Sequence, residues 1–200
     1  MKKLKFQINI VILINIFSLN VFAQTKTNLE VVQSLISKNV NEISKTVPSN
    51  NTEEIELKFI AADDYKILKT KLIEDLQNNN FTLENESNNK FNFTLSEVKI
   101  IYKDIFRDGI LGEYLIERET NLKSSFFVEN KNEIGKVNNF SFTKLDTVKY
   151  DDIKKLENIA FSFTSAELPS EPFFSSILEP VIAVGTAAVA VYLFFNIRSN

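Results

Sequence analysis

The sequence of 200 residues contains no cysteine, no histidine and no tryptophan. Without cysteine the chain can form no disulfide, no thiolate nucleophile, no zinc knuckle and no lipid-modified cysteine. Without histidine it has neither a Ser-His-Asp triad nor an imidazole metal ligand, and it lacks the usual pH switch near neutrality. Glycine and proline are scarce, with four residues each against 23 asparagines, so the turns depend on asparagine.

What remains is the composition of a folded chain. Hydrophobic residues make up 44% and charged residues 24% of the sequence, and the net charge is -3. These values favour a globular protein over a disordered one. The length allows one modest domain together with segments that are not part of it.

Residues 1–23 predict a signal peptide. Three lysines, Lys2, Lys3 and Lys5, precede an apolar run that ends at Ala23, a small residue of the kind that signal peptidase needs. We expect cleavage after Ala23, which leaves Gln24 as the first residue. The alternative is an uncleaved N-terminal anchor.

Residues 177–197 predict a single transmembrane helix. The largely apolar part from Val181 to Ile197 spans about 25 Å as a helix, the short end of a membrane crossing, and Asn196 near its end shortens the strictly apolar part. A buried core helix is the alternative, and it is less favoured because the segment is apolar on every side. Small residues at spacings that let a second helix approach suggest association within the membrane: Ala183, Thr186, Ala187 and Ala190.

The charges flanking the two apolar segments predict the orientation. The N-terminal lysines and Arg198 are both cytoplasmic if the middle of the chain is exported. This divides the chain into an exported domain (24–164), a juxtamembrane linker (165–176), the span and a cytoplasmic tail (198–200). The abundance of Lys, Asn, Ile and Phe is typical of an AT-rich bacterial genome, so we expect a single-pass protein whose domain faces the periplasmic side of the inner membrane.

The exported part is acidic. Of 23 basic residues, the four at the two cytoplasmic flanks are excluded, which leaves 19 against 26 acidic residues, a formal charge of -7. The lysines are interleaved with acids and form no basic cluster. Nucleic acid needs a basic face, so we expect no nucleic-acid partner.

The periodicities predict an α+β fold: helix, strand, helix, strand, and then an antiparallel β-meander. Residues 28–47 carry an apolar stripe at helical spacing, with Thr27 or Asn28 as its cap. A strand over 54–60 and a helix that opens at Asp63 follow, and a short strand at 81–83 comes next.

From Lys90 onward the apolar residues alternate, which predicts long strands around a turn at Asp108-Gly109. A third strand starts at Phe140, a short helix occupies 150–158, and 160–164 returns as an edge strand. One face of the first long strand is expected to carry Val98, Ile100, Tyr102, Asp104 and Phe106. The second is expected to carry Tyr114, Ile116, Arg118, Thr120, Leu122, Ser124, Phe126 and Val128.

Asp104 and Arg118 are charged residues on otherwise apolar strand faces. A three-residue loop at 108–110 would place them several residues apart, whereas a longer loop would bring Arg118 beside Tyr102 with Asp104 diagonal to it. The three residues form a candidate ligand site in which Arg118 grips an anion. The alternative is a structural charge pair at the rim of the sheet, or an arginine that reaches past Tyr102 to water.

No catalytic residue, metal site or cofactor is expected. Carboxylate pairs such as Glu117 and Glu119 resemble solvated surface, and no acidic segment has the spacing of a calcium loop. We therefore expect a non-enzymatic, membrane-tethered accessory or scaffolding module that binds other envelope proteins through a sheet edge or its acidic surface. The alternatives are a carboxylate-dependent enzyme acting on envelope glycan and a small-anion binder centred on Arg118.

Overall fold

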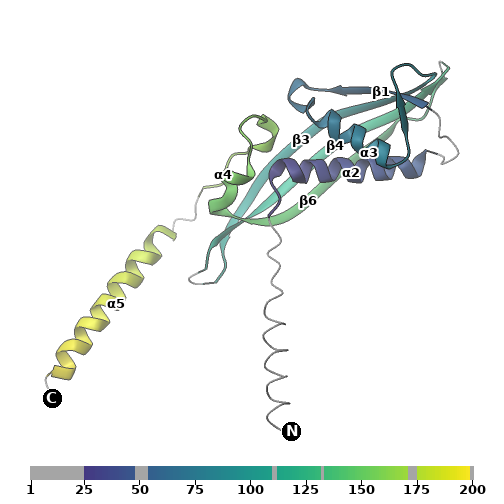
Figure 1. Ribbon diagram of the computed structural model, residues 1–200. Helices are drawn as coiled ribbons and strands as arrows, with labels where there is room; N and C mark the ends of the chain where they lie inside the picture. Colours follow the sequence, from purple (N-terminus) through teal and green to yellow (C-terminus); the bar gives the residue numbers. More distant parts are fainter. Residues whose placement is uncertain (1–24, 48–53, 110–111, 132, 171–174, 199–200) are drawn as a thin grey trace, which may run out of the picture.

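The computed structural model describes residues 25–47, 54–109, 112–131, 133–170 and 175–198. It has a mixed α+β architecture in which one six-stranded sheet carries two helices on one face (Figure 1). The signal peptide predicted over 1–23 lies outside the described residues.

Helix α2 (Asn28–Thr46) begins where the sequence predicts. Thr27 is its N-cap, and a capping box joins the Thr27 side chain to the backbone N–H of Glu30 and the Glu30 side chain to the backbone N–H of Thr27. The buried face of the helix is wider than the predicted stripe and contains two asparagines among its apolar residues: Asn28, Val31, Val32, Leu35, Ile36, Asn39, Val40 and Ile43.

The first half of the sheet is parallel. Strand β1 (Glu54–Ala61) pairs in parallel with the short β2 (Thr82–Glu84) on one side and with β3 (Asn89–Arg107) on the other. Between β1 and β2 the chain forms a 3-10 turn, η1 (Asp63–Tyr65), and helix α3 (Leu68–Asn78). The prediction that the helix starts at Asp63 is therefore wrong by about one turn. Asn80 has a positive φ of 66°, as expected for an asparagine that ends a helix.

The second half of the sheet is the predicted antiparallel meander. Strand β4 (Tyr114–Asn130) pairs with β3 on one side and with β6 (Asn138–Lys149) on the other, and a two-residue strand, β5 (Glu133–Ile134), pairs with the end of β4. The face predicted for β4 is the face that packs against the helices. Its residues from Ile116 to Phe126 are buried at every second position.

The face predicted for the first long strand is wrong beyond Tyr102. The register runs from Tyr102 opposite Arg118 to Ile105 opposite Ile116, so β3 has an extra residue and forms a bulge. Ile105 packs against the core, whereas Asp104 and Phe106 are exposed. The bulge exchanges a buried charge for a partly buried isoleucine, which avoids the cost of desolvating a carboxylate.

The longer of the two predicted loops is the correct one. The N–H of Asp108 donates to the carbonyl of Glu113 at 3.0 Å, and Gly109 adopts a φ of 75°, a conformation that favours glycine. The three-residue loop at 108–110 is therefore excluded.

The chain then folds back to the sheet in three short pieces, η2 (Tyr150–Asp152), α4 (Ile153–Leu156) and η3 (Ser162–Thr164). The first two match the predicted short helix. The edge strand predicted over 160–164 is wrong, because this segment is a 3-10 turn whose Phe163 and Thr164 are buried. Phe163 stacks edge-on against Tyr65 with ring centroids 5.5 Å apart, so the aromatic spacing reflects packing and not strand alternation.

Helix α5 (Ser175–Arg198) covers the segment predicted to cross the membrane and stands apart from the sheet in Figure 1. Within the described part of the chain, no helix meets both the length and the hydropathy needed for a membrane span. The span over 177–197 therefore stays a prediction.

Candidate functional site: a buried arginine network that joins the ends of the domain

Arg118 lies on β4, the central one of three adjacent strands, and is completely buried. It projects from β4 toward α2, with Tyr102 of β3 directly opposite on one side and Asp146 of β6 directly opposite on the other. A charged side chain with 0% exposure needs partners for its N–H groups, because an unpaired buried charge is strongly unfavourable.

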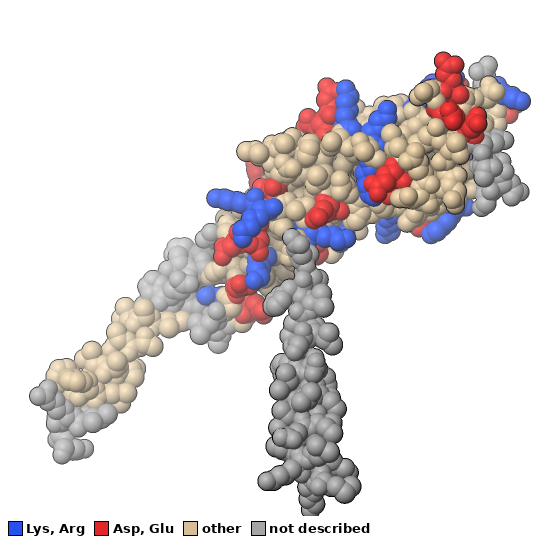
Figure 2. Space-filling view, in the orientation of Figure 1, with Lys and Arg blue, Asp and Glu red and all other residues tan. Residues whose placement is uncertain are grey.

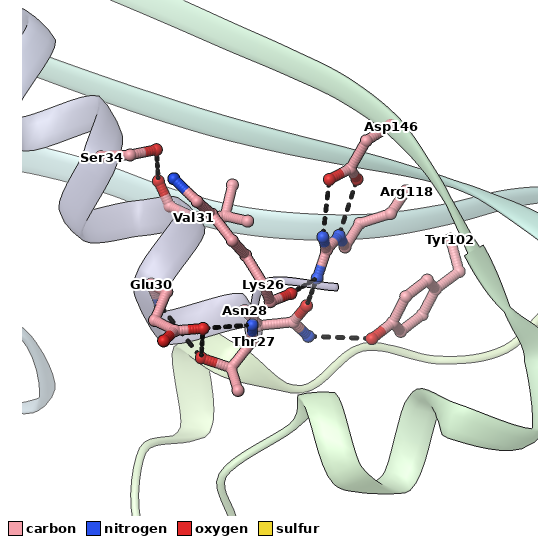
Figure 3. A network of polar contacts seen from close by, with 9 residues as sticks. All are labelled: Lys26, Thr27, Asn28, Glu30, Val31, Ser34, Tyr102, Arg118 and Asp146. Atoms are coloured by element: carbon pink, nitrogen blue, oxygen red, sulfur yellow. Dashed lines mark hydrogen bonds and ion pairs between the residues drawn. The ribbon is translucent and has the colours of Figure 1, made fainter. Parts of the chain in front are cut away.

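Asp146 supplies the opposite charge. Nε of Arg118 donates to Oδ1 of Asp146 at 2.8 Å, and Nη2 donates to Oδ2 at 2.6 Å (Figure 3). This is the two-pronged geometry in which a guanidinium and a carboxylate bind most strongly. Asp146 keeps 29% of its side chain exposed, so the pair is half in contact with water and its carboxylate is less desolvated than the guanidinium.

The start of α2 supplies the remaining partners of the guanidinium. Nη1 donates to Oδ1 of Asn28 at 2.6 Å and to the backbone carbonyl of Lys26 at 2.9 Å. The capping box on Thr27 fixes the first turn of the helix, and this places the Asn28 amide over the sheet. Hydrogen bonding from Thr27 also lowers the pKa of the Glu30 carboxyl, which keeps that cap ionised.

Asn28 extends the network to the C-terminal part of the domain. Its Nδ2 donates to the Tyr102 hydroxyl at 2.8 Å and to the backbone carbonyl of Thr164 at 2.6 Å. Thr164 is itself buried, and its hydroxyl donates to the carbonyl of Phe161 at 2.8 Å and accepts from the N–H of Asn158 at 2.9 Å. Residues 26–28 and 164 are thus held together, although 136 positions separate Asn28 from Thr164.

Burial dominates the electrostatics of Tyr102. Its removal from water raises the pKa of the hydroxyl to about 12, and the nearby carboxylate of Glu157 acts in the same direction. The hydrogen bond with Asn28 and the charge of Arg118 oppose the shift. Tyr102 is therefore neutral at any physiological pH and acts as a hydrogen-bonding partner, with no tendency to supply a proton.

Of the three residues predicted for a ligand site, the structure brings together two, Tyr102 and Arg118, and joins them through Asn28. Tyr102 and Arg118 both bind Asn28, whereas Asp104 is exposed in the bulge and takes no part in the network. The guanidinium makes four hydrogen bonds to protein groups. In this arrangement Arg118 presents no open edge to an anion, and its ligand is the protein's own carboxylate.

Asn28 and Asp146 were not predicted as partners of Arg118. A signal for Asp146 was present, since Phe140, Phe142, Asp146 and Val148 alternate on the face of β6 that continues the buried face of β4. Had the third strand been extended to Lys149, a charge would have been expected beside Arg118. Asn28 gave no such signal, because an asparagine at a helix start is usually explained by capping alone.

Glu117 and Glu119 do not form the pair of carboxylates that a glycosidase uses. Glu117 and Glu119 lie on the open face of the sheet, where Lys103 pairs with both. The hydrogen bond from Lys103 is the largest of the effects that lower the pKa of Glu119, whereas a general acid needs a raised value. A wide hollow of about 620 Å³ at the far end of the sheet is lined by Glu54, Glu56 and Glu86 together with Ser87, Asn88, Asn89 and Lys90.

The remaining predicted features add no chemistry to the described surface. No three His, Cys, Asp or Glu side chains of the described residues gather to hold a metal ion. On the face shown in Figure 2, acidic and basic side chains are interleaved. In α5, Ala183, Thr186, Ala187 and Ala190 are exposed, and the Thr186 hydroxyl bonds within its own helix to the carbonyl of Ile182, so helix association remains a prediction.

Comparison with known proteins identifies no family. No protein-family model matches the chain, and no curated protein matches it either. Solved structures with some similarity include a minor lipoprotein from Acinetobacter baumannii, with 14% identity, a TM-score of 0.36, and coverage of 48% of this chain and 66% of that one. Rare lipoprotein B from Shewanella oneidensis shows 13% identity and a TM-score of 0.34, with coverage of 69% of this chain and 98% of that one. Similarity at this level carries no argument about function.

Proposed function

We propose that this chain is a non-enzymatic accessory module of the cell envelope, tethered to a membrane and exported, which binds other envelope proteins. The observation that carries the proposal is that the arginine network holds both ends of the folded domain at one end of the sheet. The residue at which the domain begins after the predicted cleavage and the linker that leads to the predicted span therefore start from the same side of the domain.

This arrangement suits a tethered protein. A domain whose two ends lie together can be anchored through its C-terminal linker, and the surface away from that side stays free for a partner. In Figure 1 the start of α2 and the segment that carries α4 lie at the same end of the sheet. The linker 165–176 has 12 residues and reaches at most about 40 Å when extended, which keeps the domain near the membrane surface.

Arg118 is occupied by internal hydrogen bonds and is not available for a reaction, which favours binding over catalysis. The only fully buried charge among the described residues is consumed by internal partners. The charges on the open face of the sheet pair with one another across strands, for instance Lys123 with Glu97 at 3.0 Å. Such a surface is suited to contact with another protein and has no acid or base prepared for a reaction.

The test combines topology with capture. The full chain is expressed in a Gram-negative host, and spheroplasts are treated with protease while intact cells serve as the control. We expect the domain to be digested only in spheroplasts and to stay with the membrane after an alkaline wash. A matched variant, Val189→Lys, places a charge in the middle of the apolar segment and should release the domain by that wash.

Crosslinking before solubilisation then tests the binding role. We expect envelope proteins to be recovered with the intact chain and lost with the Val189→Lys variant. Protection of the domain from protease in spheroplasts would contradict export, and recovery of no envelope protein with the intact chain would contradict the accessory role.

A further inference from the structure

Strand β6 forms a long, regular edge of the sheet. Among the strands that the structure describes, it pairs only with β4, over an unbroken register from Asn138 opposite Phe126 to Lys149 opposite Leu115. The opposite edge of the sheet is β2, which is only three residues long. Natural proteins usually protect long edges with prolines, bulges or covering segments, because an exposed row of N–H and C=O groups invites another strand. β6 contains no proline and its register shows no bulge.

The sequence of β6 is complementary to itself in one antiparallel register. With Leu145 opposite Leu145 of a second copy, Lys144 faces Asp146 of that copy, and Asp146 faces its Lys144. Thr143 then faces Thr147, and Phe142 faces Val148. Opposite charges, threonine pairs and aromatic–aliphatic pairs are the cross-strand combinations that stabilise antiparallel strands.

The exposure of these side chains agrees with that register. Leu145 is an apolar side chain that lies on the open face of the sheet and is 55% exposed. Lys144 has no ion pair among the described residues, and Asp146 keeps part of its carboxylate exposed beyond its contact with Arg118. A Leu145–Leu145 contact would cover both leucines, and each Asp146 would receive a second cation.

We propose that β6 is the dimerisation edge of this protein, where two copies join their sheets through antiparallel pairing centred on Leu145. The two-fold axis passes between the two Leu145 residues at right angles to the sheet, so each copy contributes the same surface. Lys144 gives the edge its selectivity: its charge is neutralised in the self-paired register and disfavours partner strands that lack an acid at that position. This inference does not depend on the proposed export of the domain.

The symmetry has a consequence for a tethered protein. Rotation about an axis normal to the sheet reverses the strand direction. The end of the sheet that carries Arg118 in one copy therefore lies opposite the corresponding end in the other copy. Both copies reach one membrane when the joined sheet lies along its surface, and the 12 residues of the linker 165–176 give each copy the slack to do so.

The absence of cysteine allows a direct test in the full chain. Leu145→Cys is expressed in membranes and oxidised, and Ile60→Cys is the matched control, since Ile60 is also 55% exposed and lies on β1, far from β6. Directly opposite residues in antiparallel strands lie within disulfide reach. We expect a disulfide-linked dimer with Leu145→Cys, and roughly tenfold less of it with Ile60→Cys.

Two further variants test the register and the charges. Co-expressed Thr143→Cys and Thr147→Cys chains of different size should form the mixed dimer in preference to either homodimer. Lys144→Glu, added to Leu145→Cys, places like charges opposite each other and should lower crosslinking roughly fivefold, whereas Lys58→Glu on β1 should leave it unchanged.

Three results would overturn the proposal. Equal crosslinking of Leu145→Cys and Ile60→Cys would indicate random collision. No dimer with Leu145→Cys, together with no mixed dimer from Thr143→Cys and Thr147→Cys, would exclude pairing at this edge. A crosslinked species whose mass is not that of two chains would show that the occupant is a strand of another protein.

Discussion

The two ends of the sheet are held together by different physics. At the end where β3 begins, phenylalanine rings stack across strands, with centroids 5.3 Å apart for Phe91 and Phe126 and 5.9 Å apart for Phe126 and Phe140. At the other end, hydrogen bonds of fixed direction join Arg118, Asn28 and Asp146. The aromatic end gains free energy from buried area and tolerates small shifts, whereas the polar end is stable only in one geometry.

The difference suggests a division of labour. The aromatic end stabilises the fold without involving the chain ends. The polar end of the sheet fixes the first and last residues of the folded domain, because two of the acceptors in the network are the backbone carbonyls of Lys26 and Thr164. We call these two segments of the domain the chain ends. Substitutions at the two ends should therefore differ in what they disturb as well as in how much they destabilise.

Loss of the buried arginine should have the largest effect. Arg118→Met leaves the Asp146 carboxylate without its partner and Asn28 without a donor, so we expect a loss of about 3–5 kcal/mol in the free energy of unfolding. Denaturant unfolding measures the loss, and hydrogen exchange should rise at residues 25–28 and 162–166. Lys103→Met, which removes an exposed cation, serves as the control and should change stability by less than about 0.5 kcal/mol. A loss of similar size without local exchange at the chain ends would show that the network does not position them.

A change at the aromatic end should have a smaller and more general effect. Phe91→Leu removes ring contacts and leaves a small void, for which we expect about 1–2 kcal/mol of destabilisation. Because Phe91 touches neither chain end, hydrogen exchange at residues 25–28 should rise only as much as global stability falls. The exposed Phe106→Leu is the control and should be nearly neutral. Selective loosening of residues 25–28 in Phe91→Leu would refute the division of labour.

The smallest expected effect appears only at high pH. The pKa of Tyr102 is raised to about 12 in the folded chain, whereas an unfolded tyrosine titrates near 10. The folded state therefore holds this proton more tightly, and the resulting stability is complete below pH 10 and is lost as the pH rises toward 12. Tyr102→Phe should cost about 1 kcal/mol at neutral pH and should unfold with a weaker pH dependence between pH 10 and 12. An unchanged pH dependence would mean that the Tyr102 hydroxyl is not buried as described.

Much of the fold follows from the sequence, and the reasons are local. The capping residue Thr27, the stripe of α2 and the alternating face of β4 are all set by residues close in the chain, and these predictions are confirmed. The bulge between Tyr102 and Ile105 could not be predicted, since it depends on how β3 and β4 align across the loop at 108–113. The same register keeps Asp104 away from Arg118, whereas a different pairing, that of β4 with β6, places Asp146 opposite Arg118.

The arginine network was only half predictable for a similar reason. Arg118 stands out as a charge on an apolar face, and Tyr102 was placed beside it by one of the two loop lengths considered. Asn28 and Thr164 come from segments 136 positions apart, and nothing in either local sequence points to the other. Long-range polar partners of this kind depend on the tertiary fold as a whole.

The most direct measurement is the distance between the two ends of the folded domain in the full-length protein in lipid. Spin labels at Lys26→Cys and Ala166→Cys, placed in a chain without other cysteines and diluted with unlabelled chain, should give one short, narrow distance distribution. A matched pair at Lys26→Cys and Glu86→Cys spans the sheet and should give a distance on the order of 40 Å. If the Lys26–Ala166 distribution is broad, or as long as the Lys26–Glu86 one, the arginine network does not hold the two ends of the domain together and the account is wrong.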